Sequence, residues 1–136
     1  MFARLKGMLG FLGGSDLTQS QREAILDLLL WTMYVDRRIA VPENEQIDQL
    51  PEEFSWRSVT PFSLYVNTSL ARVREVLSDP EAAETLLADV QRRLDTEATR
   101  RKAYEACNRL ACADGQVAEE EARFLERIQA RFGLSV

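Results

Sequence analysis

The sequence predicts an all-α fold: a single bundle of about six to seven helices with two pseudo-symmetric helical hairpins. Apolar residues recur every three or four positions along most of the 136-residue chain, as they do on the buried face of a helix. Four of the six glycines lie within residues 1–14, which leaves few sites for the tight turns of β-hairpins. No segment shows the sustained alternation of apolar and polar residues that is typical of strands.

The apolar spacing places each expected helix in turn, and prolines separate several of them. Proline fits the first turn of a helix, where its missing N–H needs no partner. Asp79, just before Pro80, is predicted to cap the helix that follows, and Gly133 to end the last helix. The expected helices are about 18–36, 42–50, 62–77, 83–94, 103–113 and 124–132.

Residues 1–14 differ from the rest of the chain, which we expect to form one domain over 15–136. The segment reads MFARLKGMLGFLGG and could place its apolar residues on one face of a short helix. It is too short to span a bilayer, and its two basic residues, Arg4 and Lys6, give little attraction to anionic lipid. We therefore expect a helix that docks on the bundle or an arm, and we disfavour membrane contact through this segment.

Composition excludes several functions. The chain has no histidine, so it cannot build a Ser-His-Asp or Cys-His catalytic group or a histidine zinc site. A net charge of −5 has the wrong sign for a protein held by nucleic-acid phosphates. Two cysteines are too few for a disulfide framework and suit a reducing cytoplasm. We expect no catalysis, no nucleic-acid partner and a cytoplasmic location, with a membrane-proximal position as the alternative.

A divergent internal repeat places four carboxylates at matching positions of its two copies. When the segment 27–54 is aligned with 105–132, Asp36 falls on Asp114 and Glu43 falls on Glu121. Each copy predicts a helix, a turn that starts at the aspartate, and a second helix with the glutamate in its first turn. Two such hairpins packed face to face could bring all four carboxylates together.

Four carboxylates at one place would suit a divalent cation. Oxygen ligands are preferred by hard cations such as calcium, magnesium and manganese, so Asp36, Glu43, Asp114 and Glu121 are the candidate metal ligands. The spacing is not that of an EF-hand. Helix capping explains the same residues, because an aspartate can accept turn N–H groups and a glutamate in a first turn favours the helix dipole. Both interpretations stay open from the residues alone.

The end of the chain carries a more specific pattern. An alanine-rich helix is followed by Ala113-Asp114-Gly115, a spaced Glu121 and a closing Phe132-Gly133-Leu134, within the sequence YEACNRLACADGQVAEEEARFLERIQARFGL. The stretch from Asp27 to Glu43 carries a similar pattern. Together these stretches resemble the TerB-like family, the tellurite-resistance TerB proteins and their relatives.

The resemblance implies a compact bundle of about seven helices with pseudo-twofold halves. It also implies an acidic cluster, proposed to bind metal, at the positions matched by the four carboxylates, and a role in tellurite resistance or wider stress responses. The chain departs from the family pattern at Arg37-Arg38, which replaces the usual Asp-Gly type of turn in the first copy.

Other residues favour structural interpretations. Cys107 and Cys112 are predicted to be small core residues that do not face each other. The basic pair Arg92-Arg93, among acidic neighbours, is predicted to lie on a solvated helix face. The segment 51–61, which contains Trp56, is expected to pack on the bundle, although an aromatic there could also anchor a partner.

Three functional hypotheses follow. The first is a TerB-like stress-response module that binds a divalent cation or a protein partner through its acidic hairpins. The second is an adaptor without a metal, which contacts an unidentified protein partner through residues 1–14 or 51–61. The third and weakest is a carboxylate-dependent metal hydrolase, because no group is evident that would position a substrate.

Overall fold

A computed structural model describes residues 17–35, 56, 59–112 and 117–134. Within these residues the chain forms helices and no strand, which confirms the all-α prediction. The described helices are α2 (Gln19–Tyr34), α4 (Phe62–Ser78), α5 (Pro80–Arg93), α6 (Glu97–Cys112) and α7 (Glu119–Phe132).

The finer predictions about the architecture are not confirmed. Five helices lie in the described residues, against six to seven predicted for the whole chain. The expected helix over about 42–50 and the segment 1–14 lie outside the described residues. The symmetry of the two hairpins therefore stays a prediction.

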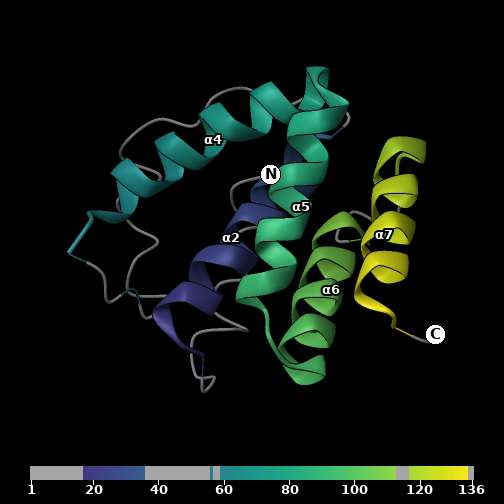
Figure 1. The fold of residues 1–136 in the computed structure, drawn as a ribbon. Coiled ribbons are helices and arrows are strands. Elements are labelled where there is room, and N and C mark those ends of the chain that lie inside the picture. Colours follow the sequence, from purple (N-terminus) through teal and green to yellow (C-terminus); the bar gives the residue numbers. More distant parts are fainter. Residues whose placement is uncertain (1–16, 36–55, 57–58, 113–116, 135–136) are drawn as a thin grey trace.

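Helix α2 forms the centre of the fold. Its side chains from Ala24 to Tyr34 are all buried, and it contacts α4, α5 and α6. In Figure 1, α5, α6 and α7 stand side by side, while α4 runs at a steep angle to α5. A helix that is apolar all round is stable only when other elements cover every face, so α2 sets the positions of the helices around it.

The polar side chains within α2 therefore need partners inside the protein. Thr32 finds its partner locally, because its hydroxyl donates to the carbonyl oxygen of Leu28 at 2.8 Å. Asp27 is fully buried and must be satisfied by residues from other helices.

Local capping signals in the sequence are confirmed. Asp79 precedes α5, and its side-chain oxygen accepts hydrogen bonds from the backbone N–H groups of Glu81 and Ala82 at 3.0 and 3.3 Å. Gly133 follows α7 with a φ of 67°, in the left-handed region that favours glycine. These two residues fix where α5 begins and where α7 ends.

The segment before α4 also packs on the bundle where the structure describes it. The ring of Trp56 lies 5.1 Å from that of Phe62 and 5.2 Å from that of Tyr65. Its indole N–H donates to the carbonyl oxygen of Thr60 at 2.9 Å. The packing predicted for this tryptophan is confirmed.

The two cysteines have different surroundings. Cys107 is fully buried, as predicted, whereas Cys112 is exposed, so the prediction of a core position was wrong for Cys112. Five residues turn a helix by about 140°, which carries Cys112 away from the face that α6 buries. Burial raises the pKa of the Cys107 thiol to about 12.

This raised pKa predicts a loss of stability in alkali. An unfolded chain releases the Cys107 proton at a pH near 9, whereas the folded protein retains it until about 12. Stability is therefore complete below the unfolded pKa and falls as the pH rises above it. Relative to Cys107→Ala, the wild type should lose about 1 kcal/mol of unfolding free energy between about pH 8 and pH 10.

Urea unfolding at several pH values, followed by circular dichroism, would measure this difference. Cys112→Ser is the matched control, because it removes a thiol and leaves the buried one unchanged. It should follow the wild type, and a Cys107→Ala curve parallel to the wild-type curve would contradict the prediction.

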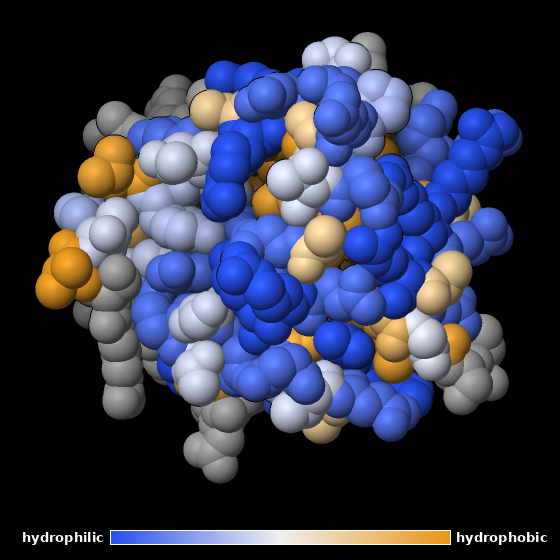
Figure 2. Space-filling model, in the orientation of Figure 1, coloured by the Kyte–Doolittle hydropathy of each residue, from blue (hydrophilic) through white to orange (hydrophobic). Residues whose placement is uncertain are grey.

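The face seen in Figure 2 is mostly hydrophilic, and apolar surface shows only in small separate patches. The most exposed large apolar side chains in the described residues are Val59 and Leu64. None of the helices that the structure describes has the length and apolar character needed to cross a membrane.

Candidate functional site

One of the four predicted metal ligands lies in the described part of the chain. Asp36, Glu43 and Asp114 lie outside it, so their approach to one another is untested. Glu121 lies in the first turn of α7 and is buried. We call the segments 36–43 and 114–121, each running from the aspartate to the glutamate of one repeat, the first and second acidic turns; Glu121 is the last residue of the second.

Glu121 takes part in capping α7. One of its carboxylate oxygens accepts a hydrogen bond from the backbone N–H of Ala118 at 3.3 Å, the contact that a glutamate makes in a capping box. The capping interpretation thus applies to Glu121, and a cation would have to share this carboxylate with the helix end. In the ranges that the structure describes, no three Asp, Glu or Cys side chains lie close enough together to hold a metal ion.

The structure contains a partly buried charge cluster, centred on a buried aspartate, that sequence reasoning missed. At its centre is Asp27 of α2, and we call the group the Asp27 cluster; its members are Asp27, Tyr65, Ser69, Arg72, Asp89 and Arg93.

Hydrogen bonds from α4 satisfy one side of the Asp27 carboxylate. Its Oδ1 atom accepts from the Ser69 hydroxyl at 2.7 Å and from the Tyr65 hydroxyl at 2.9 Å. Burial raises the pKa of the Tyr65 phenol, and the charge of Asp27 raises it further. The phenol therefore stays protonated and remains a donor.

Two arginines neutralise Asp27. The Nη2 atom of Arg93 in α5 lies 2.6 Å from Oδ2, and Nη2 of Arg72 in α4 lies 3.3 Å from the same oxygen. Asp89 contacts Arg93 at 2.9 Å and so adds a second carboxylate. Burial alone would lower the pKa of Arg93, but the charge of Asp27 and their hydrogen bond hold it above its usual value.

This arrangement favours a structural role. Both oxygens of Asp27 are occupied, and its side chain has no access to solvent, so it cannot act as a base or ligand without breaking the cluster. What it does is join α2, α4 and α5 through charge-assisted bonds.

The cluster corrects one interpretation of the sequence. Arg93 was predicted to lie on a solvated face with Arg92, but the Arg93 side chain is only 16% exposed and pairs with Asp27. Arg92, in contrast, is 78% exposed. The sequence signal that could have revealed the cluster is Asp27 itself, the one charged residue in the apolar stretch 24–35.

The repeat pairs residues whose surroundings differ. Asp27 aligns with Glu105, yet Asp27 is buried and Glu105 is exposed. The position that joins helices through a buried carboxylate in the first copy is therefore a surface position in the second copy.

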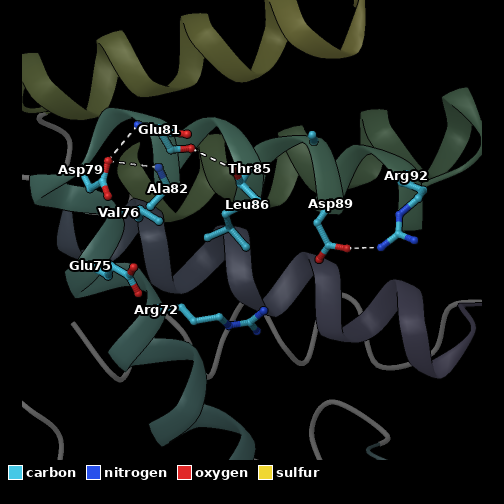
Figure 3. Close-up of a pocket in the computed structure, with 11 residues that line it drawn as sticks. Arg72, Glu75, Val76, Asp79, Glu81, Ala82, Thr85, Leu86, Asp89 and Arg92 are labelled. Atoms are coloured by element: carbon cyan, nitrogen blue, oxygen red, sulfur yellow. Dashed lines mark hydrogen bonds and ion pairs between the residues drawn. The ribbon is translucent and has the colours of Figure 1, made fainter.

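An open groove lies between α4 and α5, next to the Asp27 cluster (Figure 3). Its volume is about 790 Å³. Val76 of α4 and Ala82 and Leu86 of α5 line its apolar part. The charged side chains at its edges are Arg72, Glu75, Asp79, Glu81, Asp89 and Arg92.

The fold and these sites define the class of protein as an all-α domain assembled around one apolar helix and joined internally by a buried aspartate. The family model described as tellurite resistance protein TerB matches residues 22–136. This match includes nearly all of α2 and every later helix, so the chain belongs to the TerB family, as the sequence resemblance predicted. No curated protein and no solved structure shows a significant match.

Proposed function

We propose that this chain is a non-catalytic TerB-like module of a stress response of the tellurite-resistance type. In this proposal it binds calcium, magnesium or manganese through Asp36, Glu43, Asp114 and Glu121. The family match supports the proposal because residues 22–136 include both acidic turns.

The observation that carries the cation proposal is the position of Glu121. This carboxylate is buried in the first turn of α7, and α6 ends at Cys112, before the second acidic turn. Helices α6 and α7 contact each other, so the two ends of this turn are attached to packed elements. A hard cation favours carboxylate oxygens held on such a frame.

The proposal assigns no catalysis to this chain. The sequence supplies no histidine as a general base, and the most buried carboxylate, Asp27, is fully engaged by donors. The two cysteines are free, which suits the cytoplasmic location that we also propose.

A cation titration of the full chain tests the proposal. Calcium, magnesium or manganese should give saturable changes in the amide NMR spectrum, as shifts or as paramagnetic broadening, near Asp36 and Asp114. Asp114→Asn should weaken binding about tenfold or more, because an amide oxygen replaces a charged ligand.

Glu121→Gln separates cation binding from capping. Glutamine can still accept the hydrogen bond from Ala118, since glutamine also serves in capping boxes, but it removes the charge. Binding should weaken while stability changes little. Glu126→Gln, an exposed carboxylate of the same helix, is the control and should bind as the wild type does. No saturable change with any of the three cations would refute the proposal.

A metal-free adaptor for a protein partner is the second candidate, and the open groove between α4 and α5 favours it. The described helices leave this groove open, with a small apolar base between charged side chains. In this case Asp114→Asn would leave partner binding unchanged.

A further inference from the structure

We propose that the groove between α4 and α5 is a docking site for a basic amphipathic segment of a partner protein. The inference rests on the adaptor function, and it names the surface and the chemistry of the partner. It does not depend on the cation proposal, because none of the four candidate ligands is among the groove's described lining residues.

The shape of the groove suits a protein segment. Helices α4 and α5 meet at Asp79 and Pro80 and diverge from there (Figure 1). Ala82 and Leu86 are four positions apart and so share one face of α5, while Val76 approaches from α4 (Figure 3). The volume of about 790 Å³ lies in the range of pockets that bury several side chains.

The apolar lining of the groove determines the first property of the partner segment, an apolar stripe. Leu86 and Val76 are 6% and 7% exposed, so they form a base that is already mostly covered, between more hydrophilic neighbours. Apolar surface is visible between hydrophilic side chains over α4 and α5 (Figure 2). A segment with an apolar stripe would cover the apolar surface that remains, so the hydrophobic contribution is small and the charges provide most of the specificity.

The acidic side chains of the groove determine the second property of the partner segment, its positive charge. Glu75 and Glu81 are exposed, and neither forms an ion pair within the described ranges. Asp79 adds a third carboxylate at the same end of the groove. The C-terminus of α4 and the N-terminus of α5 meet here, so the partial charges of the two helix ends oppose each other and the carboxylates set the sign of the local charge.

The arginines of the groove offset this charge only in part. Three arginines, Arg72, Arg92 and Arg93, share two aspartates there, which leaves one positive charge against three carboxylates. Arg72 pairs with Asp27, and Arg92 pairs with Asp89. The unbalanced charge is therefore negative and lies where α4 meets α5. Lysine or arginine on the partner would complement it, and the net charge of −5 would speed the approach of a basic partner.

A designed peptide pair tests the inference on the full chain. The probe is a helical peptide of about 14 residues, the length of α5, with leucines on one face and lysines on the other. The matched control peptide carries glutamates in place of the lysines. The lysine peptide should give saturable amide shifts confined to α4 and α5, and the glutamate peptide should give none.

Charge reversal identifies the binding site. The double variant Glu75→Lys/Glu81→Lys should weaken lysine-peptide binding about tenfold. Glu105→Lys/Glu126→Lys makes the same change in net charge at two exposed carboxylates of α6 and α7, and it should bind within about twofold of the wild type. Fluorescence anisotropy of labelled peptide measures both affinities.

Three results would overturn the inference. Equal losses in the two double variants would mean unspecific charge attraction. Saturable shifts centred on another surface would place partner binding there and leave an adaptor function intact. If Glu75→Lys/Glu81→Lys alone shifted the amides of residues 1–14 without any peptide, the chain's own N-terminal segment would be the occupant.

Discussion

Asp27→Asn should lower the free energy of unfolding by about 2–3 kcal/mol. The substitution keeps the size of the side chain but removes the charge that neutralises two arginines. Arg93, whose side chain is 16% exposed, would keep Asp89 as a counter-ion, and Arg72 would lose the ion pair it forms with Asp27. Arg72 is 39% exposed, so solvent screens its charge. The cost arises because the asparagine amide would direct N–H donors at the Arg93 guanidinium, and a buried polar group left without a partner costs about 1–3 kcal/mol.

Guanidinium unfolding followed by circular dichroism would measure this loss. Glu105→Gln is the matched control, because the repeat aligns Glu105 with Asp27 while the structure leaves it exposed. It should change stability by less than about 0.5 kcal/mol, as surface substitutions do. A loss below about 1 kcal/mol for Asp27→Asn would show that the cluster contributes little.

The sequence predicts the local parts of the fold well. Capping by Asp79 and the left-handed end at Gly133 depend on residues within a few positions, so their signals are complete in the sequence. The start of α2 is equally local, since Thr18 and Gln21 form a reciprocal capping box. Helix types and approximate bounds follow from the same short-range rules.

The Asp27 cluster could not be predicted in this way. Its partners lie far along the chain: Tyr65 is 38 residues from Asp27, and Arg93 is 66 residues away. The density of charged residues around Arg93 in the sequence predicts that this side chain is exposed to solvent. It is instead largely buried, because α5 packs against α2 and brings Arg93 to Asp27. The sequence signals that Asp27 needs partners, but not which residues supply them.

The candidate metal site also depends on residues that are far apart in the sequence, and only Glu121 of its four carboxylates lies in the described part of the chain. Capping and cation binding call for the same glutamate in the same first turn; Glu121 caps α7, and its position alone does not test cation binding. The discriminating property is the position of other carboxylates around it, which depends on tertiary packing rather than on spacing. The titration of Glu121→Gln separates the two because it changes charge and preserves the cap.

Phe124→Ala is expected to give the second large effect, a loss of about 3–5 kcal/mol of unfolding free energy. Phe124 of α7 is 5% exposed, and its ring centroid lies 4.7 Å from that of the buried Trp31 in α2. This contact joins the last helix to the central one. The ion pairs of Arg127 and Arg131 with Glu84 also connect α7 to α5, but they are partly exposed and contribute little.

Tryptophan fluorescence reports the change directly, because removal of the ring would expose Trp31 and shift its emission to longer wavelength. Phe124→Leu is the control: it keeps most of the apolar volume and loses the aromatic contact, so it should cost only about 1 kcal/mol.

Since Glu121 lies one turn earlier in α7, Phe124→Ala should also weaken cation binding, whereas Phe124→Leu should retain it. If both variants were equally unstable, the aromatic contact rather than the filled volume would hold α7 in place. If neither lost stability, α7 would not depend on its contact with α2.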